Sequence, residues 1–202
     1  MNEGRLFVVS GPSGTGKGTI CDMLIDEVGA ILSVSMTTRK PRRGEVDGKS
    51  YYFVSKAEFE EIIAGDGFLE FAKVYGNYYG TPKKEVLSFL ESGKDVILEI
   101  DVQGAIQIKG RYPDGVFIFV LPPSMATLRD RIIKRGSESD DAVRVRMGAA
   151  MNEISHIGAY NYYVVNQDIN EAVTRVKAIV TAEHSKVTKG TYKLIEKFKE
   201  EL

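Results

Sequence analysis

The segment from Gly11 to Thr19 constrains the fold of this chain most strongly. It reads Gly11-Pro12-Ser13-Gly14-Thr15-Gly16-Lys17-Gly18-Thr19, and an apolar run, 6–9, precedes it. A strand followed by a glycine-rich turn, a lysine and a helix is the arrangement that wraps backbone N–H groups around a phosphate chain. Glycine permits backbone conformations that a side chain forbids, and the helix N-terminus adds unpaired donors. The segment therefore predicts a phosphate-binding loop, in which the Lys17 ammonium reaches the outer phosphates.

This loop departs from the usual pattern at Gly18. A Ser or Thr hydroxyl normally follows the lysine and binds Mg²⁺, whereas here the hydroxyl comes one residue later, at Thr19. One helical step is about 100° of rotation, so Thr19 does not replace the missing ligand. We therefore expect ATP phosphates and water molecules to provide most of the Mg²⁺ ligands, and we assign no protein ligand to the ion. The Lys-Gly-Thr ending also occurs in nucleoside monophosphate kinases and favours that group.

Length and composition limit the class of protein. A chain of 202 residues suits one α/β domain with inserted subregions. Its formal net charge of −1 does not favour a nucleic-acid or membrane surface as partner. The single cysteine, Cys21, falls in the apolar pattern of the first predicted helix, so we expect a core residue and no disulfide. No apolar run approaches the roughly 20 residues of a membrane span, and the N-terminus leads directly into the first predicted strand. We expect a cytoplasmic protein.

Apolar, β-branched runs alternate with helical patterns, which is typical of a parallel sheet covered by helices on both faces. Thr81 and Pro82 are interpreted as an N-cap followed by proline at the first helical position. A solvated amphipathic helix is expected after Lys186. The predicted strands are 6–10, 32–36, 96–100, 116–121 and 162–165, and the predicted helices are 16–28, 82–91, 103–111, 124–134, 140–155 and 169–185.

Two stretches interrupt this alternation. The first, about 37–81, holds clustered aromatic residues and a capping box at Ser55 and Glu58 that opens a short helix, which predicts a small inserted α+β subdomain. The second, about 129–154, is rich in arginine and contains a glycine hinge, the composition of a mobile lid. The core of the single domain, 1–202, would then comprise about 1–36, 82–128 and 155–202.

Charged and phenolic side chains at the insert indicate a second phosphate site. The guanidinium group of arginine can bind a phosphate through two parallel hydrogen bonds. A cluster of basic residues such as 39–43 is, however, often only a solvated loop. Further hydroxyls that can donate to phosphate oxygens come from Tyr51 and from the segment Gly76-Asn77-Tyr78-Tyr79-Gly80-Thr81.

Two carboxylates, Glu99 and Asp101, lie at the end of a predicted strand, on the edge where parallel sheets bind ligands. Carboxylates there are unfavourable unless paired, which favours a role with substrate or hydrated Mg²⁺.

Together these segments resemble the bacterial guanylate kinases. The resemblance spans about residues 4–185 and implies the P-loop nucleoside monophosphate kinase fold. It also implies the reaction ATP + GMP ⇌ ADP + GDP, with dGMP as a related acceptor and Mg²⁺ as cofactor. Monomer and homodimer both remain open. The motifs that carry the resemblance are 35–45, 76–81 and 99–104, the phosphate loop, Pro122-Pro123-Ser124 and Arg135-Gly136-Ser137-Glu138.

The resemblance also implies roles for individual residues. The phosphate loop, 11–19, would bind ATP, and Asn166 matches a family asparagine near the adenine site. The catalytic residues would be Lys17 and the lid arginines Arg131, Arg135 and Arg146, which bridge donor and acceptor phosphates. The GMP phosphate would be held by Arg39, Arg42, Tyr51 and Tyr79. Guanine would be recognised by Ser35, Glu70 and Thr81, with Asp101 nearby.

The chemistry of guanine agrees with this assignment. Its N1–H and N2–H₂ donors suit the Glu70 carboxylate, and its O6 acceptor suits the hydroxyls of Ser35 and Thr81. Adenine lacks the N1 donor and the O6 acceptor, and leaving a buried polar group unpaired in this way costs factors of about 10⁴. Positioning and charge neutralisation dominate phosphoryl transfer, so we expect direct in-line transfer under a closed lid that excludes water.

Two alternatives remain open. A catalytically inactive guanylate-kinase-like module would bind phosphorylated peptides at the GMP site, but such modules typically lack the phosphate loop and lid that Lys17 and the lid arginines indicate. A small-molecule kinase with another acceptor would share the phosphate loop and differ at the acceptor site, where Arg39, Arg42 and Glu70 favour guanine.

Overall fold

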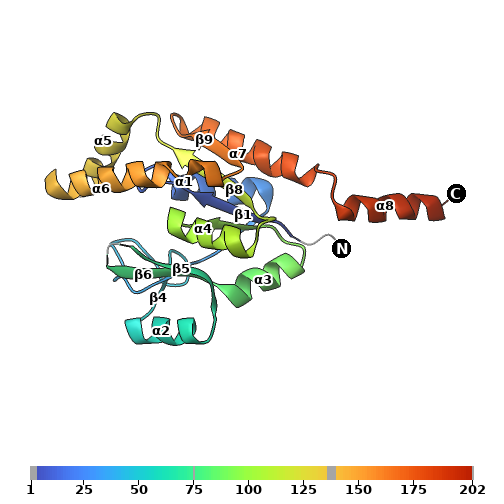
Figure 1. Cartoon of the computed structure of the whole chain (residues 1–202), viewed down its shortest axis with the longest axis horizontal. Helices are drawn as coiled ribbons and strands as arrows, with labels where there is room; N and C mark the ends of the chain where they lie inside the picture. The colour runs from blue at the N-terminus through green and yellow to red at the C-terminus, as the bar shows by residue number, and fades with distance from the viewer. Residues whose placement is uncertain (1–3, 75, 136–139, 202) are drawn as a thin grey trace.

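A parallel sheet forms the centre of the molecule. The computed structural model describes residues 4–74, 76–135 and 140–201 (Figure 1). Within these residues, five strands pair in the order β2-β7-β1-β8-β9, so the chain runs from β1 to one side of the sheet and then to the other. Ligands bind beyond the strand ends at such a reversal. The strands are β1 (Leu6–Ser10), β2 (Ile31–Leu32), β7 (Val96–Glu99), β8 (Val116–Leu121) and β9 (Tyr162–Val165).

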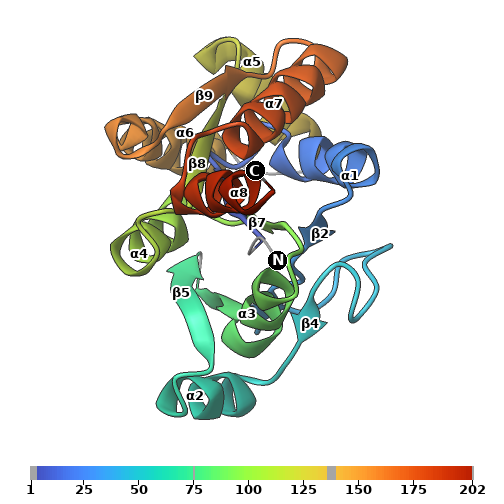
Figure 2. The ribbon, with the colours of Figure 1, turned by 90° about the vertical axis from the view of Figure 1, so that its right-hand side faces the viewer.

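Helices cover both faces of this sheet (Figures 1 and 2). On one face α1 (Lys17–Val28) and α7 (Ile169–His184) pack on β1 and β8 through a cluster that includes Ile20, Leu24 and Val176. On the other face α3 (Lys83–Glu91) and α4 (Val102–Arg111) bury Val86 and Ile108. The remaining elements of this part are α5 (Met125–Arg135), α6 (Asp140–Ile154), the short 3-10 helix Ile157–Ala159, and α8 (Lys189–Glu200), which extends away from the body.

A second, smaller sheet lies below the first in Figure 1. In the part of the chain that the structure describes, it has four strands in the order β4-β3-β6-β5, with β5 and β6 forming an antiparallel hairpin. Helix α2 (Lys56–Ala64) packs on it through Phe59, whose ring lies 4.4 Å from that of Phe68 and 5.3 Å from that of Tyr78. Its strands are β3 (Met36–Thr37), β4 (Tyr52–Phe53), β5 (Phe68–Val74) and β6 (Asn77–Pro82).

The structure confirms the parallel sheet between helices and the capping box at Ser55, in which the serine hydroxyl accepts from the Glu58 N–H. It also confirms Cys21 as a core residue, where burial raises the pKa of the thiol. Among the described residues, no helix has both the length and the apolar character needed to cross a bilayer.

Two predicted features are wrong. The strand expected over 32–36 is divided, because the chain leaves the first sheet after Ser33, whose N–H still bonds the Ile97 carbonyl, and Met36 begins a strand of the second sheet. Thr81 is not an N-cap, because β6 continues through Pro82, and Pro82 itself precedes the first turn of α3.

Phe59 should be essential to the stability of the second sheet. The ring is fully buried between two other aromatic rings, so Phe59→Ala is expected to lower the free energy of unfolding by about 3–5 kcal/mol. Urea denaturation followed by circular dichroism measures this loss. The matched control is Phe198→Ala, at a side chain that is 54% exposed on α8, where we expect a change within about 0.5 kcal/mol. Equal losses in the two variants would contradict this account of the packing.

Candidate active site

The loop between β1 and α1 has the conformation that its glycines predict. Gly11, Gly14 and Gly16 have φ values of 137°, 89° and 89°, a region that favours glycine. At Gly11 a Cβ atom would lie 2.4 Å from the carbonyl oxygen of Val120 in β8, so a larger residue does not fit. Lys17 Nζ donates to the carbonyl oxygens of Gly11 at 2.7 Å and Pro12 at 3.1 Å. The ammonium group is thus held over its own loop.

The first turn of α1 offers donors to an anion. Gly16 is the N-cap, and among the described residues no side chain caps the helix there. A Cβ atom at Gly18 would lie 3.3 Å from Glu99 Oε2, so the Glu99 carboxylate lies beside this turn. The described residues contain no group of three or more His, Cys, Asp or Glu that could hold a metal ion. One carboxylate beside a phosphate site nevertheless suits Mg²⁺, which keeps most of its waters.

Asn166 connects the phosphate loop to β9 and α5. Its Nδ2 donates to the Thr15 carbonyl at 2.8 Å, and Arg131 Nη2 donates to the Asn166 carbonyl at 3.0 Å. Arg131 Nη1 is buried and has no hydrogen-bond partner among the described residues. Because an unpaired buried donor is unfavourable, especially on a charged group, this nitrogen is suited to a phosphate oxygen.

The other predicted lid residues are only partly described. Arg146 lies on α6 and is half-buried. Arg135 ends α5, but its side chain and residues 136–138 lie outside what the structure describes.

Glu153, on the last turn of α6, was not predicted from the sequence. Burial raises the pKa of its carboxyl group, and the positive charge of Lys17 opposes that rise. A glutamate in a helical pattern is usually expected to face solvent, so the sequence carries no signal that would have identified it.

Arg39 follows β3, Tyr51 precedes β4 and Tyr79 lies in β6, and their side chains meet beside the second sheet. Arg39 Nε donates to the Tyr79 hydroxyl at 3.2 Å, and the guanidinium carbon lies 5.4 Å from the centre of the Tyr51 ring. Both terminal nitrogens donate to Glu45, at 2.9 and 2.8 Å, which raises the pKa of Arg39 and lowers that of Glu45. Arg42 is exposed in the same loop, and its backbone N–H donates to Glu45 Oε2 at 2.7 Å.

Glu70 is a buried carboxylate on β5, only 3% exposed. Burial raises its pKa to about 7, although the Thr81 hydroxyl, which donates to Oε1 at 2.6 Å, lowers it. Asp101 raises the pKa of Glu70 further and itself caps α4, because its Oδ1 accepts from the N–H groups of Gln103 and Gly104 at 2.7 and 3.1 Å. A perturbed carboxyl group beside a specific partner is typical of a functional site.

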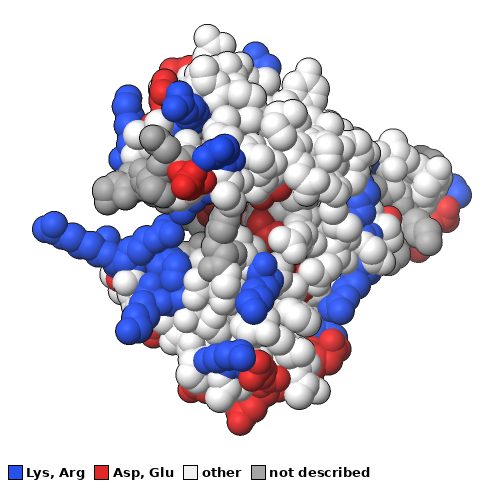
Figure 3. Space-filling view, turned by 60° about the vertical axis from the view of Figure 1, so that its left-hand side comes forward, with Lys and Arg blue, Asp and Glu red and all other residues white. Residues whose placement is uncertain are grey.

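Ser35, Tyr51 and Glu99 lie in the wall of a cavity of about 430 Å³ between α1 and the loop that precedes β4. Figure 3 shows Lys and Arg side chains gathered around a hollow on one face, with acidic side chains visible inside it. The described positions therefore combine cationic groups that suit phosphate with one buried carboxylate, Glu70, that suits N–H donors.

Comparison with known proteins agrees with this chemistry. A family model described as guanylate kinase matches residues 3–183. The guanylate kinase of Clostridium tetani is 55% identical over 187 residues, which cover 93% of this chain and 90% of that protein. That of Clostridioides difficile is 51% identical over 203 residues, covering 100% and 99%.

A solved structure extends the likeness to three dimensions. The crystal structure of guanylate kinase from Anaplasma phagocytophilum has a TM-score of 0.82 and 36% identity, covering 96% of this chain and 95% of that one. Because the family model, the relatives and this fold all agree over most of its length, the chain belongs to the guanylate kinase family.

Proposed function

We propose that this protein transfers the γ-phosphoryl group of ATP to GMP or dGMP, giving ADP and GDP or dGDP. The observation that carries the proposal is the buried Glu70 carboxylate, in a chain whose first strand ends in a phosphate loop. A single carboxylate can accept from both N1–H and N2–H₂ of guanine. Membership of the guanylate kinase family supports the same reaction.

On the donor side, the loop 11–19 would hold the ATP phosphates through its backbone N–H groups. Lys17 would leave the carbonyls that it contacts and bind the outer phosphates, where negative charge develops during transfer. When bound, Mg²⁺ would neutralise charge on the phosphates, and Glu99 is the residue beside the loop that would hold it through water.

On the acceptor side, the GMP phosphate would take the place of Glu45 on the Arg39 guanidinium. Arg42, Tyr51 and Tyr79 would complete this phosphate site. Ser35 and Glu70 would recognise guanine, with Asp101 nearby. The Thr81 hydroxyl donates to the Glu70 carboxylate, and it would have to turn to donate to O6.

Transfer would be direct and in line, since phosphoryl transfer requires positioning and charge neutralisation more than covalent catalysis. Arg131, Arg135 and Arg146 would stabilise the transferred group. We divide the chain into a core, a GMP-binding insert of about 37–81 and a lid of about 129–154, whose closure would exclude water.

A coupled assay of ADP release with GMP, dGMP, AMP, UMP and CMP tests the proposal. We expect GMP and dGMP to be phosphorylated and the other three to react poorly. Preference for AMP or UMP would refute the role of Glu70. A phosphopeptide-binding module would release no ADP with any of them.

Replacing Lys17 should abolish most activity without unfolding the protein. Lys17→Ala removes a positive charge that acts on the transition state, so we expect kcat to fall by about 10²–10³. Lys84→Ala, at an exposed position of α3, is the control and should retain full activity. Circular dichroism checks that both variants fold. A fully active Lys17→Ala protein would disprove the role of the phosphate loop.

Glu70→Gln should relax the choice of base. The amide offers one acceptor and one unwanted donor to guanine, so kcat/KM for GMP should fall about 10- to 100-fold, the range for a hydrogen bond to a charged group. The KM for ATP should stay the same. Unchanged preference for GMP over AMP would point to a different base-recognition residue.

The titration of Glu70 predicts a specific dependence of stability on pH. Its pKa of about 7 in the folded state lies above the ordinary value of 4.5, so the folded state binds more protons between these values. The free energy of unfolding of the protein without ligand should therefore fall as the pH rises from about 5 to 7. Urea denaturation at several pH values should give a smaller fall for Glu70→Gln. Parallel curves for the two proteins would contradict the assignment.

A further inference from the structure

Strand β5 is irregular next to Glu70. Phe68 pairs with Pro82 of β6, and Glu70 pairs with the preceding residue, Thr81, so Leu69 is an extra residue between two pairs. Leu69 packs in the apolar cluster under α4, and the Glu70 carboxylate also lies against α4. Two consecutive side chains thus face the same helix, which regular alternation forbids. A β-bulge of this kind redirects a side chain.

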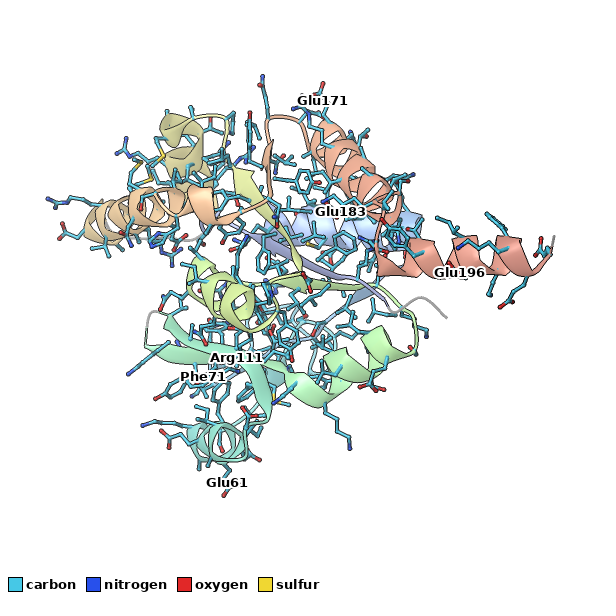
Figure 4. All side chains as sticks on the ribbon, turned by 45° about the vertical axis from the view of Figure 1, so that its right-hand side comes forward. Glu61, Phe71, Arg111, Glu171, Glu183 and Glu196 are labelled. Carbon is cyan, nitrogen blue, oxygen red and sulfur yellow. The ribbon has the colours of Figure 1, made fainter. Side chains whose placement is uncertain are left out.

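Arg111, the last residue of α4, bonds the backbone of the bulge. Its Nη1 donates to the carbonyl oxygens of Leu69 at 2.8 Å and Phe68 at 3.3 Å. Ladder hydrogen bonds are disrupted at a bulge, so these carbonyls need another donor. A guanidinium group supplies a charge-assisted one. Figure 4 labels Arg111 and Phe71 where α4 meets β5.

Gln107, one turn earlier on α4, bonds the residue on the other side of Glu70. Its Nε2 donates to the Phe71 carbonyl at 2.8 Å, and its Oε1 accepts from the Phe71 N–H at 3.4 Å. The side-chain amide therefore pairs with β5 as a neighbouring strand would. Together, Gln107 and Arg111 hold the backbone on both sides of Glu70.

Gly104 lies on the same face of α4, three residues before Gln107. A Cβ atom there would lie 2.4 Å from Glu70 Oε2 and 2.9 Å from its carboxyl carbon. Glycine inside a helix is about 1 kcal/mol less favourable than alanine, so its presence needs a reason. The Glu70 carboxylate fills the space that the missing side chain leaves.

We propose that Arg111 and Gln107 are positioning residues that hold the bulge of β5 and so direct Glu70 at the guanine base. The inference rests on the proposed role of Glu70 in base recognition. Neither residue needs to touch the nucleotide, because each acts on the backbone that carries Glu70. The Arg111 charge also lowers the pKa of Glu70, which favours the ionised form that accepts from guanine.

Arg111→Met tests this inference, with IMP, which lacks the N2 amino group, as the competing acceptor. We expect the KM for GMP to rise about tenfold and the preference for GMP over IMP to fall about tenfold, which is 1.4 kcal/mol. The KM for ATP should not change. The control is Lys109→Met, which also removes a cation from α4 but lies over the Phe117 ring, 4.7 Å from its centre. It should leave the preference unchanged.

A second readout separates positioning from general destabilisation. Arg111→Lys keeps the charge and a donor nitrogen but loses the planar guanidinium group, so it should restore part of the preference for GMP. The pH at which kcat/KM for GMP reaches half its maximum should rise in Arg111→Met, because the carboxyl group loses a nearby cation. An unchanged pH profile together with unchanged preference would overturn the inference.

The Glu70→Gln background distinguishes the two proposals. If Arg111 acts through Glu70, Arg111→Met should change the preference for GMP over IMP little in that background. An equal effect in both backgrounds overturns the positioning role. If Glu70→Gln alone leaves the preference unchanged, the proposed role of Glu70 fails. If it relaxes the preference and Arg111→Met does not, only the positioning inference fails.

Gln107→Met keeps the experiment decisive should Arg111→Met fail to fold. This change removes both bonds to the Phe71 backbone without altering charge. The same loss of preference for GMP over IMP is expected, and a folded Gln107→Met protein with unchanged preference would overturn the inference.

Discussion

Burial of the central strands on both faces determines where polar chemistry can occur in this protein. All five residues of β1 are buried, so the strands admit mainly apolar side chains. Functional groups therefore follow the strands at their carboxyl ends: the phosphate loop after β1, Glu99 at the end of β7, and Asn166 directly after β9. Because the strands are parallel, these ends meet at one edge. The sheet thus gathers groups that are far apart in the sequence.

Several charged groups of the candidate site have partners within the protein. Lys17 contacts loop carbonyls, Arg39 pairs with Glu45, and Glu70 accepts from Thr81. A nucleotide would exchange these partners for its own phosphates and base. Binding would then depend on the difference between two sets of hydrogen bonds, which is smaller than the full strength of the bonds to the nucleotide. Arg131 Nη1 differs, because it has no partner among the described residues and a bound phosphate would give it one without displacing another.

Local signals in the sequence were sufficient for part of the fold and site. The phosphate loop and the capping box at Ser55 depend on residues a few positions apart, and both formed as predicted. The strand over 32–36 was wrong because a crossing between two sheets depends on distant pairing partners. Thr81 was misread for the same reason, since its partner is Glu70. Arg111 and Glu153 have no local signal, because charged residues on helices are usually solvated.

Helix α4 connects the central sheet to strand β5 of the second sheet. It begins at the carboxyl edge of the central sheet, where Asp101 caps it, and it ends at Arg111 on the backbone of β5. The carboxylate proposed to read the base is therefore held by the core. The arginines proposed to hold the GMP phosphate, Arg39 and Arg42, lie instead in the loop around Glu45. Their hydrogen bonds join them to Glu45 in that loop and to the Tyr79 hydroxyl. Under these proposals, base choice and phosphate affinity would depend on different elements, and substitutions in α4 should alter base choice while they leave the bonds of Arg39 to Glu45 and Tyr79 in place.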